Sequence, residues 1–270
     1  MEELKTTEKL SSQEYWNNVL EKAKLPRVNS SRSYHYSITM DFIDNCIRDQ
    51  SYASFFEVGC GSSGWLPYFA ETYGFKVSGI DYSEVGCRLA EENLRILNIP
   101  YGEIICKDIF EENCTDGKKY DIVFSYGVIE HFEKPEEIIA IFSSFLNTGG
   151  IMITLVPNLN GFMGLLSRWF IPDIYKMHRV INKEQLGGYH ESNALKNLKT
   201  NYAGTFTFAV LPLVHSKHWL FREGSIQRKI AVFGFSSVDK LVSRIFRLFK
   251  IDIPTKRFSP YIISIAAKYI

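Results

Sequence analysis

Cysteine is scarce in this sequence, and its few copies form no pattern. The five cysteines, at positions 46, 60, 87, 106 and 114, are odd in number and contain no C-x-x-C pair or Cys/His cluster. Such a distribution supports neither a zinc site nor a disulfide framework. We therefore expect reduced thiols, no bound metal and a cytoplasmic setting.

Long apolar runs and an excess of charge are also lacking. No uninterrupted apolar run approaches the ~20 residues of a membrane-spanning helix, and residues 1–5 lack the apolar centre of a signal peptide. Lys and Arg total 31 against 30 Asp and Glu, which leaves a net charge of +1. We therefore expect no general attraction for nucleic acid. The length of 270 residues, 46% of them hydrophobic, suits one elaborated globular domain.

The most informative stretch is residues 54–64, Ser-Phe-Phe-Glu-Val-Gly-Cys-Gly-Ser-Ser-Gly. A largely apolar run leads into three glycines, and an amphipathic segment follows at 65–73. This order predicts a buried strand, a tight turn and the start of a helix. Glycine permits a ligand to approach the bare backbone, and a helix N-terminus offers unpaired N–H groups to a polar ligand.

A second strand, 76–80, leads directly to Asp81. An acidic residue after the second strand of a parallel sheet is placed to bind ribose hydroxyls. The glycine turn and this carboxylate together predict a site for a nucleoside-type cofactor at the carboxyl edge of the sheet.

Strand-like and helix-like segments alternate through the middle of the chain, which is typical of a parallel sheet. We expect strands at 54–58, 76–80, 103–107, 121–125, 151–156, 204–214 and 261–267. We expect helices at 13–24, 34–48, 65–73, 84–97, 135–146 and 237–250. The last strand follows a long connection, so it can pair antiparallel beside the fifth or sixth strand.

The motifs of the central block resemble those of the class I S-adenosylmethionine-dependent methyltransferases. They are Glu57-x-Gly59-x-Gly61, Asp81, Asp108, and the run from Tyr120 through Ser125 to Glu130-His131-Phe132. That last run closely resembles the fourth-strand motif of quinone-biosynthesis methyltransferases. The resemblance covers about residues 50–157. One departure is Ser63, which stands where the family has its third glycine.

The resemblance implies a Rossmann-like, seven-stranded, mostly parallel sheet with helices on both faces. It implies an N-terminal helical cap at 1–50, a cofactor-binding core at 51–157, and an insertion with the end of the sheet at 158–270. S-adenosylmethionine is the implied cofactor, with S-adenosylhomocysteine as product. The implied cofactor-binding residues are Glu57, Gly59, Cys60, Gly61, Asp81, Tyr82, Asp108, Ile109, Ser125 and Tyr126.

The remaining candidates concern the methyl acceptor, for which we expect a small or medium metabolite methylated at oxygen. His131 follows the fourth strand and is the candidate general base, whereas Glu130 is expected to be structural. His178 and His190 are candidates on the substrate side, and each could equally be a surface or capping residue. A sugar precursor, a lipid-linked intermediate and a secondary metabolite are all compatible acceptors, and methylation at nitrogen or carbon is left open as well.

Two alternatives accompany this interpretation. Residues 59–64 also satisfy the G-x-G-x-x-G pattern of NAD(P)-dependent oxidoreductases, and a catalytically silent nucleoside-binding module has the same motifs. The helix expected at 237–250 has an apolar stripe and a basic side. Together with the apolar segment 162–175, it is either an ordinary packed helix or a contact with a membrane or a lipid-linked substrate.

Overall fold

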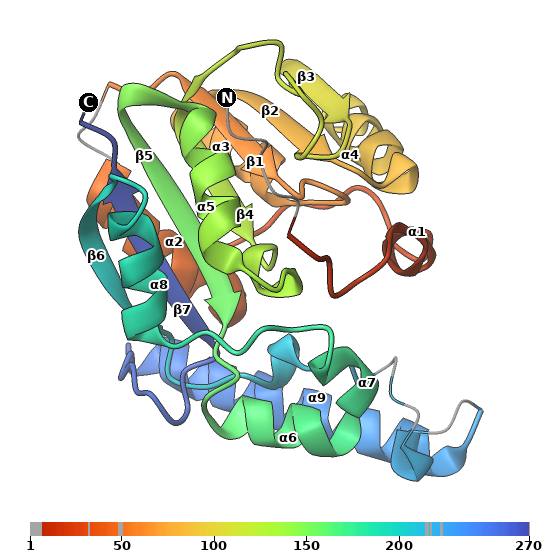
Figure 1. Ribbon diagram of the computed structural model, residues 1–270. Helices are drawn as coiled ribbons and strands as arrows, with labels where there is room; N and C mark the ends of the chain where they lie inside the picture. Colours follow the sequence, from red (N-terminus) through yellow and green to blue (C-terminus); the bar gives the residue numbers. More distant parts are fainter. Residues whose placement is uncertain are drawn as a thin grey trace.

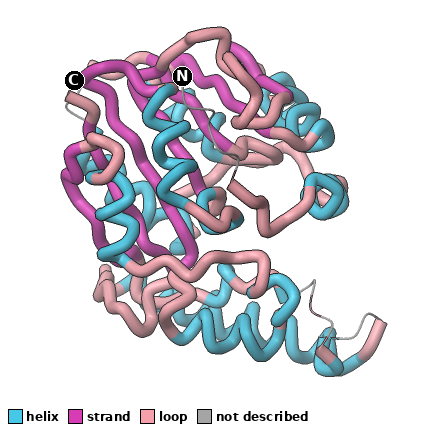
Figure 2. The backbone as a smooth tube through the Cα atoms, in the orientation of Figure 1, coloured by secondary structure: helices cyan, strands magenta, loops and turns pink. Residues whose placement is uncertain are grey.

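The computed structural model describes residues 7–31, 33–47, 51–213, 216, 218–221 and 224–269. A seven-stranded sheet runs through the molecule in the order β3-β2-β1-β4-β5-β7-β6. Helices cover both faces of the sheet (Figures 1 and 2). This architecture confirms the fold class predicted from the sequence.

The strands and helices have the following bounds. The strands are β1 Ser54–Val58, β2 Lys76–Asp81, β3 Tyr101–Cys106, β4 Tyr120–Tyr126, β5 Leu146–Pro157, β6 Lys196–Ala203 and β7 Tyr261–Ala267. The described α-helices are α1 Gln13–Leu20, α2 Tyr34–Ile47, α3 Trp65–Tyr73, α4 Glu84–Ile96, α5 Pro135–Ser144, α6 Phe162–Phe170, α7 Pro172–Tyr175, α8 Lys183–Glu191 and α9 Ile226–Leu248. Short 3₁₀ turns include η1 Ile129–His131, η2 Phe208–Val210 and η4 Trp219–Phe221.

The five strands from β3 to β5 are parallel, and β7 is antiparallel to both β5 and β6. The central strands are buried on both faces because their side chains alternate between two cores. Phe55 and Phe124 point into a core with α2, α3 and α4, whereas Phe56 and Val123 point into a core with α5 and α8. This packing fixes the carboxyl ends of β1, β2 and β4 along one rim.

A third apolar cluster joins α6, α7, α9 and the 3₁₀ turns beyond β5. In Figure 1 these elements lie together below the end of the sheet. They occupy the stretch that the sequence analysis assigned to an insertion. Among the described residues, no helix is both long and apolar enough to cross a membrane.

Several predicted boundaries need correction. The sixth strand is β6 at Lys196–Ala203, and the predicted strand at 204–214 is wrong as far as those residues are described. Residues 147–150, which lie between the predicted helix at 135–146 and the predicted strand at 151–156, belong to β5. The first helix, α1, ends at Leu20 instead of position 24, and α9 begins well before the predicted residue 237. The predicted end of the second helix at position 48 lies outside the described residues.

Candidate active site

A cavity of about 510 Å³ opens at the carboxyl ends of the parallel strands. Its volume lies in the range of small-molecule and cofactor sites. Of the predicted cofactor residues, all except Ser125 line it; these are Glu57, Gly59, Cys60, Gly61, Asp81, Tyr82, Asp108, Ile109 and Tyr126. Ser125 is buried in β4 and is not part of the lining.

The turn after β1 approaches the cavity through Gly59, which has a φ of +74°. A Cβ atom at Gly59 would lie 2.7 Å from Cγ2 of Val128, so both the backbone conformation and the space require glycine. Val128 follows β4 and also lines the cavity. The glycine turn and the segment after β4 are therefore in direct contact, although they are far apart in the sequence.

Glu57 lies at the floor of this turn and is 2% exposed. Its Oε1 accepts a hydrogen bond of 2.7 Å from the hydroxyl of Ser63, the residue that departs from the family pattern. Its Oε2 has no hydrogen-bond partner among the described residues. Burial raises the pKa of Glu57 well above its usual range. Burial disfavours the charged form unless a positive partner is present, so the site is suited to a cationic ligand group that would hold Glu57 as the carboxylate.

Asp81 is held by the two backbone segments beside it. Its Oδ2 accepts from the N–H of Gly61 at 2.9 Å, and its Oδ1 accepts from the N–H of Ser83 at 2.8 Å. Burial raises the pKa of Asp81 to about 6, and these hydrogen bonds oppose the shift. The carboxyl group thus helps to shape the glycine turn while lining the cavity, so its capping role and its predicted ligand role are compatible.

The first described residues, from position 7 on, contribute to the cavity wall. Lys9 forms an ion pair with Asp108 and a β-bridge with Phe132. Trp16 of α1 packs edge-on against His131, with ring centroids 5.1 Å apart. Lys9, Trp16 and Arg27 all line the cavity. The sequence analysis did not identify these three residues, because only the folded chain brings them to the rim.

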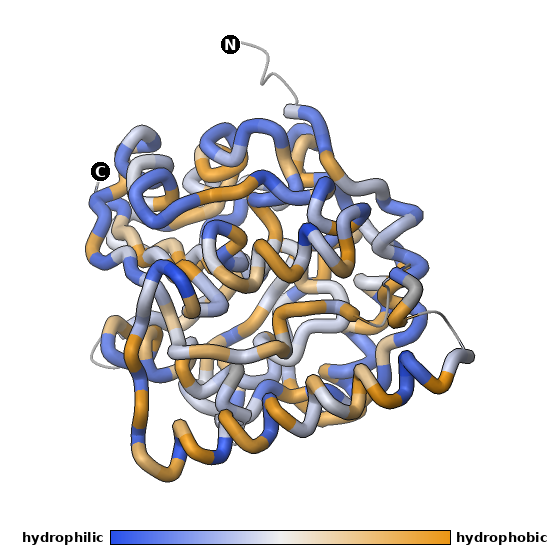
Figure 3. The backbone as a smooth tube through the Cα atoms, turned by 90° about the horizontal axis from the view of Figure 1, so that it is seen from below, coloured by the Kyte–Doolittle hydropathy of each residue, from blue (hydrophilic) through white to orange (hydrophobic). Residues whose placement is uncertain are grey.

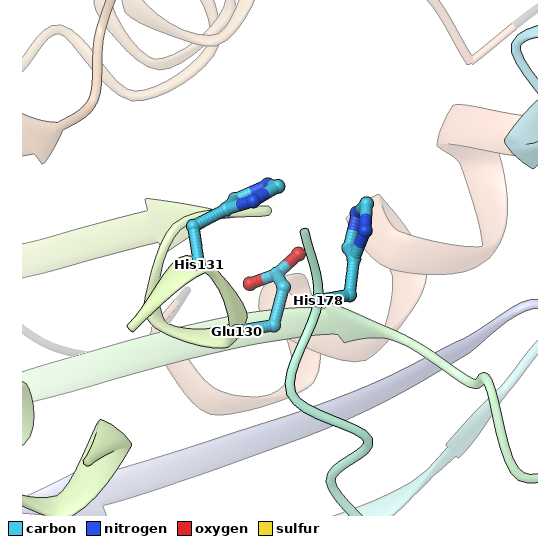
Figure 4. Close-up of side chains that lie close together, drawn as sticks. All are labelled: Glu130, His131 and His178. Carbon is cyan, nitrogen blue, oxygen red and sulfur yellow. The ribbon is translucent and has the colours of Figure 1, made fainter. Parts of the chain in front are cut away.

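Three titratable side chains meet at the other end of the cavity. Glu130 and His131 belong to η1, and His178 comes from the loop after α7. One ligand atom from each lies within 4.8 Å of the others. Figure 4 shows the Glu130 carboxyl group between the two imidazole rings. We refer to these three residues as the acid–histidine cluster.

The two imidazoles present their Nε2 atoms as acceptors. Nδ1 of His131 lies 2.8 Å from the carbonyl oxygen of Met177, and Nδ1 of His178 lies 2.7 Å from that of Ile174. A carbonyl oxygen can only accept, so each Nδ1 carries the proton and each Nε2 retains a lone pair. Burial and the adjacent His178 lower the pKa of His131 to about 3. Both rings are therefore neutral at physiological pH.

Glu130 complements the two neutral rings. Burial raises its pKa to about 8, and its Oε2 lacks a hydrogen-bond partner within the described part of the chain. The cluster can therefore take up a proton, or bind a divalent cation through one carboxylate and two imidazoles. The sequence analysis expected no metal site, and the spacing of these residues did not reveal that His178 would join Glu130 and His131.

His190 has a different role from the one considered for it. It is fully buried, and its two ring nitrogens lie 3.1 Å from Oγ1 of Thr154 and 2.9 Å from Oγ of Ser264. It therefore links α8 to β5 and β7 within the core, and it does not line the cavity. The proposal of His190 as a substrate-side residue is wrong.

The strand order, the glycine turn and the acidic strand ends define the class of protein. In the dinucleotide-binding fold the common order is 3-2-1-4-5-6 in a parallel sheet, whereas here an antiparallel β7 lies between β5 and β6. Residues 56–154 match the family model described as "Methyltransferase domain". This match covers the central block of the chain, and it agrees with the resemblance to class I S-adenosylmethionine-dependent methyltransferases found in the sequence.

Comparisons with individual proteins agree with this assignment. The chain is 31% identical over 105 residues to a ubiquinone biosynthesis O-methyltransferase from Glaesserella parasuis serovar 5, an overlap of 38% of this chain and 44% of the relative. It is similar in fold to the plantazolicin methyltransferase BamL (TM-score 0.55, 16% identity, 96% of this chain and 90% of that one). It is also similar to magnesium protoporphyrin IX methyltransferase from Synechocystis PCC 6803 (TM-score 0.56, 15% identity, 95% and 97%). The chain spans about half the length of the curated relatives it matches.

Proposed function

We propose that this protein is an S-adenosylmethionine-dependent methyltransferase that methylates a small or medium metabolite at oxygen. The observation that carries the proposal is the unsatisfied Oε2 of buried Glu57, beside a glycine turn in the cavity. The solved structures of BamL and of magnesium protoporphyrin IX methyltransferase both contain S-adenosylhomocysteine. Their fold supports the same cofactor here.

The residues present fit this cofactor. Glu57 would bind its amino group, because a buried carboxylate favours a cation. Arg27, whose Nη1 donates to Oγ of Ser62 at 3.2 Å, would face the carboxylate of the same end. Asp81 would accept from the ribose hydroxyls, and Asp108 with Ile109 would border the adenine ring. S-adenosylmethionine supplies a methyl group on a positively charged sulfur, ready for transfer to a nucleophile.

An oxygen acceptor must lose its hydroxyl proton during the transfer, and the acid–histidine cluster is the group that we assign to this step. Nε2 of His131 would accept the hydrogen bond from the acceptor hydroxyl. An imidazole whose pKa is lowered to about 3 is a weak base by itself, so the adjacent Glu130 carboxylate would stabilise the charge that develops on the ring. His178 would position the acceptor through its own Nε2.

Methylation at oxygen has a second line of support in the curated relatives, which are named as O-methyltransferases. Apolar and aromatic side chains accompany the cluster in the cavity wall, among them Trp16, Tyr36, Val210 and Tyr261. An acceptor with an apolar or aromatic body and one reactive hydroxyl fits this wall. A lipid-linked intermediate meets this description, and so does an aromatic metabolite.

Ligand binding to the full chain tests the proposed cofactor. S-adenosylhomocysteine should raise the melting temperature and NADH should not. Glu57→Gln should weaken the Kd for S-adenosylhomocysteine by about tenfold or more, because a charge-assisted hydrogen bond is lost. Glu92→Gln, which changes an exposed acid on α4, is the matched control and should bind normally. Stabilisation by NADH alone would instead favour the oxidoreductase.

Methyl transfer is measured separately, with a labelled methyl donor and a panel of small hydroxylated acceptors. Incorporation of label into one of them would support catalysis. Tight binding of S-adenosylhomocysteine without transfer to any fraction of cell metabolites would favour the silent binding module.

A further inference from the structure

The longest described helix, α9, buries none of its residues, although it has 23 of them. It packs on the molecule along one side only. Val232 and Phe235 contact the third apolar cluster, and Phe246 packs against the core beneath the sheet. Asp239 accepts hydrogen bonds of 2.7 Å from the hydroxyl of Thr207 and from the N–H of Phe208. These contacts identify the inner side of the helix.

A second apolar stripe follows the opposite side of α9. Ile226, Ile230, Phe233, Leu241 and Leu248 recur at helical spacing, so they share one face. They are strongly exposed: Phe233 is 74% and Leu241 61% exposed. Figure 3, which views the molecule from below, shows hydrophobic segments recurring along the whole of this helix. An ordinary surface helix needs only the inner stripe, so the outer one requires another explanation.

Basic residues border the outer stripe. Lys229, Lys240 and Arg247 are exposed and are separated by nearly whole numbers of turns, at about 3.6 residues a turn, so they form a row along one edge. Between positions 226 and 250 there are six Lys or Arg residues and one acidic residue. That acidic residue is Asp239, which is bound on the inner side. The outer face is therefore apolar with a basic edge.

The neighbouring helix α6 also has exposed apolar side chains. Trp169 and Leu165 of α6 are 67% and 59% exposed. Phe170 of α6 packs edge-on against Phe235 of α9, with ring centroids 6.2 Å apart. Figure 1 shows the two helices side by side at the lower edge of the molecule. We call the exposed apolar residues of α9 and α6, with the basic row, the α9 surface.

We propose that the α9 surface binds the face of an anionic lipid bilayer, with α9 lying in the plane of the interface. A helix with an exposed apolar face and a basic edge gains from inserting its side chains among the acyl chains and from pairing its cations with lipid phosphates. A second copy of the chain is the other candidate occupant. It is disfavoured because two α9 helices facing each other would bring like charges together.

The proposal is tested with the full chain and sedimentable vesicles. The protein should bind vesicles that contain phosphatidylglycerol much more strongly than vesicles of phosphatidylcholine alone, and salt should weaken the binding. The double variant Phe233→Ser/Leu241→Ser should reduce the partition coefficient by about tenfold or more. Lys229→Glu/Lys240→Glu should reduce binding to anionic vesicles by at least a similar factor.

Matched controls change the same residue types elsewhere. Ile96→Ser alters an exposed apolar residue of α4, and Lys119→Glu alters an exposed lysine before β4. Both should bind vesicles like the unchanged protein. Each variant is also titrated with S-adenosylhomocysteine, and an unchanged Kd shows that it is folded. This readout also separates failure of lipid binding from failure of the proposed methyltransferase function.

Two results would overturn the proposal. One is that the protein does not bind anionic vesicles, or that the α9 variants bind them as strongly as the control variants do. The other is a dimer in solution that Phe233→Ser/Leu241→Ser converts to a monomer, because a second copy would then cover the α9 surface.

Discussion

The titratable side chains of the cavity form two separate groups, one at each end. Glu57 and Asp81 face the predicted cofactor end, where burial raises the pKa of both carboxyls. The acid–histidine cluster faces the predicted acceptor end. Because the two groups use different side chains, substitutions should separate binding of S-adenosylhomocysteine from turnover.

Turnover should depend on the acid–histidine cluster. We expect His131→Ala and Glu130→Gln each to lower kcat by about a hundredfold, the usual size of acid–base catalysis. The double variant should be little worse than either single variant, because the two residues act on one proton. The rate should rise with pH with a midpoint near pH 8, where Glu130 is half ionised, and level off at higher pH. The measurement is steady-state turnover with a labelled methyl donor.

Two controls accompany that experiment. The Kd for S-adenosylhomocysteine should be unchanged in both variants, since neither residue is assigned to the cofactor. Activity should persist in EDTA. If EDTA abolished turnover and a divalent cation restored it, Glu130, His131 and His178 would be metal ligands instead of proton acceptors.

Cofactor affinity should depend on the ionisation of Asp81. Its pKa of about 6 in the free protein is above the ordinary value of about 3.9. Below pH 6 the group is protonated and accepts hydrogen bonds from ribose hydroxyls poorly, whereas the carboxylate present above pH 6 accepts them well. The Kd for S-adenosylhomocysteine should therefore weaken by up to about tenfold per pH unit below pH 6 and be constant above pH 7.

Titration calorimetry between pH 5 and 8 measures this dependence. Asp81→Asn should bind more weakly at neutral pH and should lose the inflection near pH 6. An Asp81→Asn variant that kept both the affinity and the inflection would remove Asp81 from the ribose site.

For folding, the dependence on pH has the opposite sign. The folded-state pKa of Asp81 is raised above the unfolded value, so folding favours the protonated form. The contribution of this group to stability is therefore present at low pH and is lost as the pH rises from about 4 to about 6. The unliganded protein should lose stability over this window through Asp81, and the bound ribose should offset that loss.

At the scale of elements, two glycines with the same backbone conformation allow a paired test. Gly59 and Gly74 have φ values of +74° and +72°. A Cβ atom at Gly74 would meet nothing within 4 Å, whereas at Gly59 it would overlap Val128. We expect Gly74→Ala to cost about 1 kcal/mol through backbone strain alone. Gly59→Ala should cost about 2–4 kcal/mol, because the clash adds to the strain.

Urea unfolding of both variants measures the difference. Equal losses of stability would show that the turn moves away from Val128 at little cost. Only Gly59→Ala should also weaken binding of S-adenosylhomocysteine, because only that turn lines the cavity.

The sequence predicted the elements with a strong apolar pattern and failed where an element is polar or exposed. β1, α3 and β7 match their predicted ranges, and β1 and β7 are almost entirely buried. β6 is an edge strand that pairs only with β7 among the described strands, and its run Lys-Asn-Leu-Lys-Thr-Asn-Tyr-Ala has little apolar signal. The apolar stretch after it suggested a strand, but Gly204 at φ +78° and Pro212 interrupt it.

The start of β5 shows a second reason for error. Its residues Asn147-Thr148-Gly149-Gly150 have the composition of a turn. Gly150 is needed because a Cβ atom there would lie 2.7 Å from the carbonyl oxygen of Asp121 in the neighbouring strand. Close contact between strands, and not a reversal of the chain, explains the glycine. A single sequence does not distinguish the two.

At the scale of the whole molecule, the motifs predicted the residues at the glycine-turn end of the cavity better than those at the end with the acid–histidine cluster. Glycine turns and acidic strand ends come from short segments whose order fixes their place on the rim. His178, Trp16, Arg27 and Lys9 reach the cavity from segments outside the central block. Their positions depend on packing over long sequence distances, which no local pattern records.

The contacts that the first described residues make along the cavity have a consequence for the proposed catalytic cycle. Lys9 forms an ion pair with Asp108, and Trp16 packs against His131. The segment from Lys9 to Trp16 therefore contacts both ends of the site. Release of S-adenosylhomocysteine would then require this segment to move away from the cavity. When the segment moved back, it would shield the next cofactor and acceptor from water. We expect the pace of repeated turnover to be set by this opening, while a single round of chemistry runs faster.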